Sequence, residues 1–246
     1  MRTVSDFTKQ PSDNDGWIQK NASSGTWANV VAASAGSSVT EGGNTNRIMT
    51  KKQGSNWQLA RAYYHFDFSS AALQRGRRLK VIGAKLILTV TSRSVADTNG
   101  DIVKLHKANV SHDGSSSNLA AGDFDQFSTT IVSNSEEQIS STGAVVIPID
   151  GALLSYLTTQ LRGGGAFNVF LMNKLDYRSD NQDDPAGQNK IDIASDSHGT
   201  AGSRPKLVVV CSTKRSARNR RKGGGSGGFG EIHIQSSGIS GFSGEK

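Results

Sequence analysis

The sequence has a single cysteine, four prolines and five histidines among 246 residues. One cysteine cannot form a disulfide within the chain, and it cannot build a zinc site from cysteine and histidine. Cys211 lies in the apolar run KLVVVCS, which is typical of a buried small side chain rather than a reactive thiol. The histidines have neither HExxH nor HxH spacing. No catalytic constellation emerges, and we expect that the protein is not an enzyme.

Long apolar runs are also missing. No stretch approaches the roughly 18 apolar residues that a membrane-spanning helix needs. The N-terminal sequence MRTVSDFTKQPSDNDG lacks the apolar core of a secretory signal. We therefore expect synthesis in the host cytoplasm, no membrane partner and no ordinary export.

Positive charge is concentrated near the C-terminus. From Ser212 onward there are seven basic residues and two acidic ones, so most of the net charge of +7 lies in this tail. The composition changes at the same place, from alternating apolar residues to basic and Gly/Ser-rich sequence. The predicted division is an N-terminal segment, 1–14; a domain, 15–211; a linker, 212–230; and a C-terminal arm, 231–246.

The domain has the alternation of β-strands. In ARAYYHFDF, residues 60–68, the even positions from Ala62 to Phe68 share one face and the odd positions share the other, which predicts a half-buried strand. AKLILTVT, residues 84–91, repeats the pattern. Segments rich in Gly, Ser, Asn and Asp separate the strands. Further strands are predicted at 16–20, 29–33, 47–50, 102–107, 144–150, 166–172, 190–195 and 205–211.

One segment has helical spacing instead. In DGALLSYLTTQL the leucines recur at 153, 154, 157 and 161, behind Asp150 as a candidate N-cap. We predict an all-β, antiparallel, jelly-roll-like β-sandwich with this one short capping helix and an extended C-terminal arm.

Three stretches, ARAYYHFDFSSAAL, VIGAKLILTV and IASDSHGTAGSRPKLVVV, share their order and spacing with one family. Together they resemble the bacterial DNRLRE domain, and the similarity covers roughly residues 15–211. The resemblance implies a β-sandwich of the kind found in carbohydrate-binding modules and in surface and phage structural proteins. It implies the fold more strongly than any particular ligand.

The segment LDYRSDNQDD, residues 175–184, offers oxygen ligands at close spacing. Carboxylates of this kind suit calcium, although the segment lacks the glycine and final glutamate of an EF-hand loop and contains Arg178. The alternative is a solvated loop without a metal. The calcium candidates are Asp176, Asp180, Asp183 and Asp184.

Aromatic side chains suggest a second possible ligand, because their faces suit the apolar faces of pyranose rings. The candidate contacts for a polysaccharide are Trp17, Trp27, Trp57 and Tyr177. The alternative is that these rings belong to the core, and next to Ile18 one of the two residues at 17 and 18 must face inward.

The basic run KRSARNRRK could neutralise about six phosphates. It has no interleaved aromatic residue for base stacking, so we do not expect a nucleic-acid partner and favour docking on another protein. The basic residues of this predicted assembly arm are Lys214, Arg215, Arg218, Arg220, Arg221 and Lys222.

The chain closes with GISGFSGEK, in which Gly238, Gly241 and Gly244 follow the Gly-X-Y period of collagen. Only glycine fits the axis of a triple helix, so the period predicts a homotrimer. Three triplets would not be stable alone, and the pattern is meaningful only as the start of a fibre or beside trimeric neighbours.

These features lead to one hypothesis and one alternative. The hypothesis is a structural protein of a phage virion, a decoration or fibre protein whose sandwich docks on capsid or tail proteins and whose arm mediates assembly. The alternative is a carbohydrate-binding module that recognises host or biofilm polysaccharide.

Overall fold

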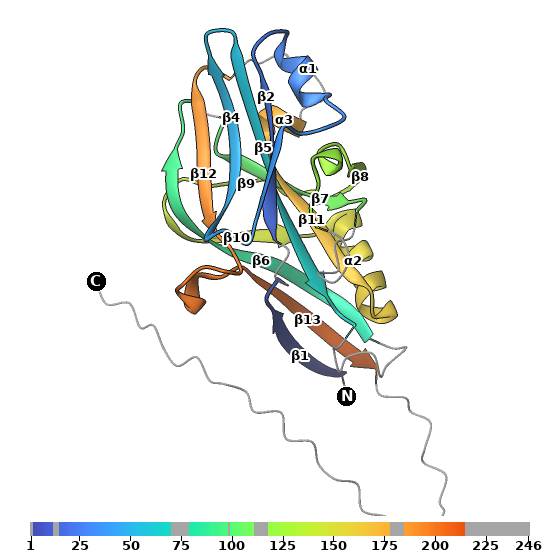
Figure 1. Ribbon diagram of the computed structural model, residues 1–246. Coiled ribbons are helices and arrows are strands. Elements are labelled where there is room, and N and C mark those ends of the chain that lie inside the picture. The colour runs from blue at the N-terminus through green and yellow to red at the C-terminus, as the bar shows by residue number, and fades with distance from the viewer. Residues whose placement is uncertain are drawn as a thin grey trace, which may run out of the picture. The chain divides into compact units, whose positions relative to one another are not determined.

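The computed structural model describes residues 2–11, 15–69, 79–97, 99–110, 118–177 and 185–214. Within these ranges the chain is mostly strand, with three short α-helices (Figure 1). The helices are α1 (Trp27–Val31), α2 (Gly151–Gly163) and α3 (Lys174–Tyr177), with 3-10 turns η2 (Ala121–Asp123) and η3 (Ala201–Ser203). The strands are β1 (Arg2–Lys9), β2 (Gly16–Ala22), β3 (Ser38–Glu41), β4 (Thr45–Gln53), β5 (Asn56–Asp67), β6 (Leu79–Ser94), β7 (Ile102–Ala108), β8 (Phe127–Val132), β9 (Glu137–Gln138), β10 (Gly143–Ile149), β11 (Ala166–Asn173), β12 (Gln188–Ala194) and β13 (Lys206–Lys214).

All strand pairings are antiparallel, and they run in the order β1-β13-β6-β12-β4-β5-β11-β7-β8. Two long strands join the parts of this sheet (Figure 1). β5 pairs with β2 and β4 through its first half and with β11 through its second half. β6 pairs with β13, β12 and β10. The predicted all-β, sandwich-like class is therefore confirmed.

A large apolar cluster fills the space between the strands around β6 and those around β5. We call it the sandwich core. The even-numbered residues of β5, from Ala62 to Phe66, lie in it, as the alternation predicts. Phe7 of β1 packs edge-on against Phe68 with ring centroids 6.2 Å apart, so β1 also contributes to it. The leucines of α2 that point into this core are Leu153, Leu157 and Leu161.

A second, smaller apolar cluster lies on the other face of β5 and β11. We call it the outer core. Its members come from β2, α1, β5, β7, the segment around η2, β11 and α3. Tyr63 and Phe170 from the neighbouring strands pack there with ring centroids 5.3 Å apart. Both faces of β5 are thus buried, and the prediction of a half-buried strand at 60–68 is wrong, because α1, η2 and α3 cover its second face.

The predicted strand at 29–33 is also wrong, because residues 27–31 form α1. Thr26 is the N-cap, and its hydroxyl accepts a hydrogen bond from the backbone N–H of Asn29 at 3.4 Å. Trp27 and Val30, three residues apart, both face the outer core. The apolar run was therefore compatible with a helix turn as well as with a strand.

The predicted helix at 150–161 is confirmed as α2. Gly164 ends it with a left-handed backbone, φ 68°, which glycine adopts without strain. In the described part of the chain, no helix is long and apolar enough to cross a membrane. β13 continues beyond Cys211 to Lys214 and pairs there with β1. Residues 215–246, which hold the rest of the predicted linker and arm, lie outside the described residues.

Candidate functional site

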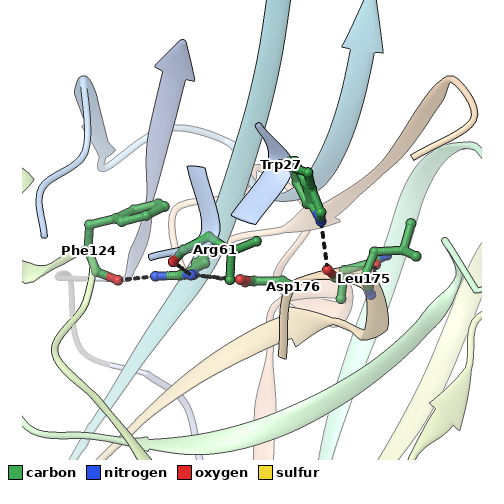
Figure 2. A network of polar contacts seen from close by, with 7 residues as sticks. Trp27, Arg61, Phe124, Leu175 and Asp176 are labelled. Atoms are coloured by element: carbon green, nitrogen blue, oxygen red, sulfur yellow. Dashed lines mark hydrogen bonds and ion pairs between the residues drawn. The ribbon is translucent and has the colours of Figure 1, made fainter. Parts of the chain in front are cut away.

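A buried ion pair organises the outer core. Arg61 lies on the outer-core face of β5, and its side chain is fully buried together with that of Asp176 in α3. The guanidinium Nε and Nη2 donate to the two carboxylate oxygens of Asp176 at 2.8 and 2.6 Å (Figure 2). Nη1 donates to the carbonyl of Phe124 at 2.5 Å, and Nη2 also donates to that of Val31 at 3.1 Å. A bidentate pair with further acceptors is the geometry that makes a buried charge tolerable.

Aromatic rings enclose the same guanidinium. Its carbon atom lies 4.0 Å from the ring centroid of Phe124 and 4.7 Å from that of Phe127. The partners of Arg61 belong to α1, to the segment around η2 and to α3, none of which is a neighbour of the others in sequence. One charged side chain therefore fastens all three to β5.

The tryptophans proposed as sugar contacts include two that are buried beside this ion pair. Trp27 and Trp57 are 1% and 5% exposed, and their rings lie 5.8 Å apart at 36°. The indole N–H of Trp27 donates to the carbonyl of Leu175 at 3.0 Å (Figure 2). Lys52 Nζ lies 4.5 Å from the Trp57 ring centroid. Their faces are used in packing, so these two rings do not form an exposed stacking platform.

The other two proposed contacts lie elsewhere. Trp17 is half-buried and lies on the opposite face of β2 from Ile18, with the Arg47 guanidinium 5.0 Å from its ring centroid. Tyr177 is half-buried at the end of α3, 5.3 Å from the ring of His106. The structure therefore does not bring the four aromatic residues into one surface.

The proposed calcium segment is described only in part. Asp176 is neither solvated nor available to a metal, since both of its carboxylate oxygens accept hydrogen bonds from Arg61. Asp180, Asp183 and Asp184 lie outside the described residues. Across the described ranges, no three His, Cys, Asp or Glu side chains gather in a way that could hold a metal ion.

A polar hollow lies at the hairpin between β4 and β5, beside the end of β2. Its volume is about 340 Å³, and side-chain amides and a lysine dominate its lining. The pattern of polar residues in a hairpin does not distinguish such a hollow from an ordinary solvated turn, so the sequence did not predict it. The residues that form it are Asn21, Ala22, Ser23, Lys51, Gln53, Asn56, Trp57 and Gln58.

An apolar surface covers the outside of β10, β6 and β13. Among the described residues, the large apolar side chains that are exposed are Ile82 and Val146, at 48% and 44%. Val146 is paired with Ile87, and Val208 with Lys85, so their side chains share this outer face. We call this surface the open face, and it consists of Ile82, Lys85, Ile87, Val146, Lys206, Val208 and Val210.

His106 of β7 is a buried histidine beside the outer core. Its Nδ1 lies 3.1 Å from the carbonyl of Ser128, while its Nε2 has no hydrogen-bond partner among the described residues. Burial lowers its pKa to about 4, against smaller opposing effects of Ser128 and Asp176. The ring packs at 5.7 Å against Phe127 and is therefore a neutral packing element rather than a general base facing a substrate.

The polar groups described above all hold parts of the fold together. Arg61 and Asp176 pair with each other, and His106 is enclosed by rings. The accessible features of the described residues include the hollow at the β4–β5 hairpin, a second hollow of about 260 Å³ between the end of β7 and α2, and the open face. No protein-family model matches this chain, and no curated protein matches it in sequence.

Proposed function

We propose that this protein is a structural component of a phage virion, a decoration or fibre protein that docks on capsid or tail proteins. The observation that carries the proposal is the open face. Apolar residues on adjacent strands, with Lys85 and Lys206 among them, are typical of a protein contact surface rather than of a solvated sheet face.

Two further features support the assembly role. Where the structure describes the chain, the open face and the hollow at the β4–β5 hairpin hold no catalytic grouping, which suits a protein that binds rather than reacts. The basic run begins at Lys214, the last residue of β13, and the glycine triplets follow further along the sequence, from Gly238. In this proposal the sandwich is the docked body, and the arm with Gly238, Gly241 and Gly244 holds three copies together.

The experiment is a measurement of mass and docking with the full chain. Mass photometry should give a trimer, which the triple substitution of Gly238, Gly241 and Gly244 by alanine should convert to monomers. Purified capsids and tails of the phage that encodes the protein should retain the wild type. The double variant Ile82→Lys, Val146→Lys should lose this retention, while Thr129→Lys, at an exposed position of β8, should keep it. A monomeric wild type that binds neither particle would overturn the proposal.

The polar hollow favours a second candidate, a carbohydrate-binding module. Side-chain amides and a lysine can form hydrogen bonds with sugar hydroxyls and carboxylates without a stacking ring. Because Trp27 and Trp57 are core residues, the informative variant is Lys51→Ala with Gln58→Ala. On a glycan array or with alginate beads, this double variant should lose binding that Lys85→Ala on the open face retains. Failure of the wild type to bind any glycan would remove this candidate.

A further inference from the structure

Two aspartates far apart in the sequence meet at one end of the sandwich core. Asp15 immediately precedes β2, and Asp196 follows β12 by two residues. Their side chains are almost fully buried, with residue exposures of 1% and 7%. Asn46 of β4 and Tyr64 of β5 complete the cluster, so four separate parts of the chain converge there.

The hydrogen bonds of this cluster reach one oxygen of each carboxyl group and leave the other oxygen without a partner among the described residues. Asp15 Oδ2 accepts from Asn46 Nδ2 at 2.8 Å and from the backbone N–H of Asp196 at 2.9 Å. Asp196 Oδ1 accepts from the Ser197 hydroxyl at 3.1 Å. Within the described residues, Asp15 Oδ1, Asp196 Oδ2 and the Tyr64 hydroxyl have no hydrogen-bond partner.

The basic side chains that the structure describes on the adjoining segments form hydrogen bonds with groups other than Asp15 and Asp196. Arg47 of β4 donates to Asp192, and Arg204 after η3 donates to the carbonyl of His198. His198 itself accepts from the backbone N–H of Thr200. Among the residues that the structure describes, the titratable groups that face Asp15 are therefore Asp196 and Tyr64.

A pair of buried carboxylates without a countercharge raises the free energy of the folded state. Removing each charge from water costs several kcal/mol, and the two negative charges also repel each other. A single proton between them removes one charge and turns repulsion into a hydrogen bond. It also supplies the donor for a hydrogen bond between the two side chains, which lie close enough to interact directly.

We propose that Asp15 and Asp196 share one proton at neutral pH and form a clasp that fastens the entry into β2 to the turn after β12 and loosens in alkali. The clasp is independent of the proposed virion function. Burial, followed by the side-chain contact with Asp196 and the negative charge of Asp196, raises the pKa of Asp15 to about 9, against smaller lowering effects of the Asp196 backbone N–H and of Asn46. The same neighbourhood raises the pKa of the Tyr64 phenol, mainly through burial.

The sign of the pH dependence follows from proton counting. The unfolded chain releases this proton near the ordinary aspartate value of 3.8, whereas the folded chain keeps it until about pH 9. The contribution of the clasp to stability is therefore complete below pH 3.8 and is lost as the pH rises toward 9. One proton corresponds to a tenfold fall in the folding equilibrium constant for each pH unit.

The test is urea unfolding of the full chain between about pH 7.5 and 8.5, where unfolded histidines are largely neutral. The folding constant of the wild type should fall by roughly tenfold per pH unit. Asp15→Asn and Asp196→Asn each replace the shared proton by a permanent amide donor and should lose this slope. Asp101→Asn is the matched control, because Asp101 is buried but paired with Arg93 at 2.8 Å. It should be less stable than wild type and keep the slope.

Infrared difference spectra provide a readout that does not depend on variant folding. Wild type at pH 7.5 should show the C=O stretch of a protonated carboxyl group, which disappears on titration through about pH 9. Absence of this band, or slopes equal in the wild type and both clasp variants, would overturn the proposal. So would calcium at millimolar concentration if it stabilised the wild type and abolished the slope, because the pair would then hold a metal ion instead of a proton.

Discussion

Arg61 makes hydrogen bonds to Asp176, Phe124 and Val31 from a position without solvent contact. A charged side chain whose three nitrogen atoms all donate hydrogen bonds can be buried, but removal of one partner leaves an uncompensated charge. The outer core therefore depends on Arg61 and Asp176 as a pair, and replacing one of them is more harmful than its share of the contacts suggests.

Asp176→Asn is predicted to lower the free energy of unfolding by about 3 to 5 kcal/mol, because Arg61 stays buried with a neutral partner. Urea unfolding measures the loss. The matched control is Glu136→Gln, which breaks the more exposed pair with Lys174 and should cost less than about 1 kcal/mol. Equal losses of unfolding free energy in the two variants would show that other groups stabilise the charge of Arg61 when Asp176 is replaced.

The lowered pKa of His106 predicts that the protein loses stability in acid. Its pKa is about 4 when folded and near 6.5 when exposed, so the unfolded state binds more protons between these values. The contribution of the neutral, buried ring is present above pH 6.5 and is lost as the pH falls toward 4. Since the Asp15–Asp196 clasp changes in the opposite sense over this range, the comparison must be between variants.

The stability advantage of the wild type over His106→Gln is predicted to shrink as the pH falls from 6.5 to 4, by about 3 kcal/mol in all. Unfolding curves at successive pH values measure it. His198→Gln, at a position near the surface, provides the control. A difference between wild type and His106→Gln that does not vary with pH would mean that the ring remains accessible to protons.

The start of α2 illustrates how an element can be positioned by a neighbour. Asp150 occupies the N-cap, yet its side chain makes no cap bond to the helix. It accepts instead from the hydroxyls of Ser133 and Ser135 and from the backbone N–H of Asn134. Although burial would raise the pKa of Asp150, these bonds hold it below its ordinary value. The carboxylate thus ties α2 to the connection between β8 and β9.

Asp150→Ala is therefore predicted to destabilise the protein by about 2 kcal/mol, because several donors lose a charged acceptor at once. Thr26→Ala, which removes only the cap of α1, should cost about 1 kcal/mol. Chemical denaturation of both variants tests the order. A larger loss for Thr26→Ala would mean that water replaces the hydrogen bonds that Ser133, Asn134 and Ser135 donate to Asp150.

The end of the folded unit can be tested by truncation. Residues Met1–Lys214 form one unit, and Ser212, Thr213 and Lys214 pair with β1. The chain that lacks 212–246 should melt several degrees below the chain that lacks only 215–246, because it also loses the strand hydrogen bonds of residues 212–214 to β1. Thermal unfolding of the two truncated chains distinguishes them. Equal melting temperatures would show that the last residues of β13 add no stability.

The distribution of apolar surface decides how the whole molecule meets its partners. Most apolar side chains are enclosed in the sandwich core and the outer core. The open face is the exception, because no described element covers the outside of β10, β6 and β13. The hollow at the β4–β5 hairpin is polar and lies on different strands. Substitutions in one surface should therefore not affect binding at the other.

Local alternation made most strands predictable, since the pleat of a strand places every second side chain on one face regardless of what lies far away. It correctly assigned Tyr64 and Phe66 to a core. It could not assign Tyr63 or Trp57 to a second core, because that core exists only where α1, η2 and α3 return to cover β5. The candidate sugar contacts failed to converge for the same reason.

The sequence by itself determined the all-β class, the positions of most strands and the helix α2, because these follow from periods of two and of about three and a half residues. The tertiary structure alone decided which polar residues are buried and with whom. Arg61 and Asp176 are 115 residues apart, and Asp15 and Asp196 are 181 residues apart. Contacts at such separations depend on how strands pair across the sheet, and local patterns carry no record of that pairing.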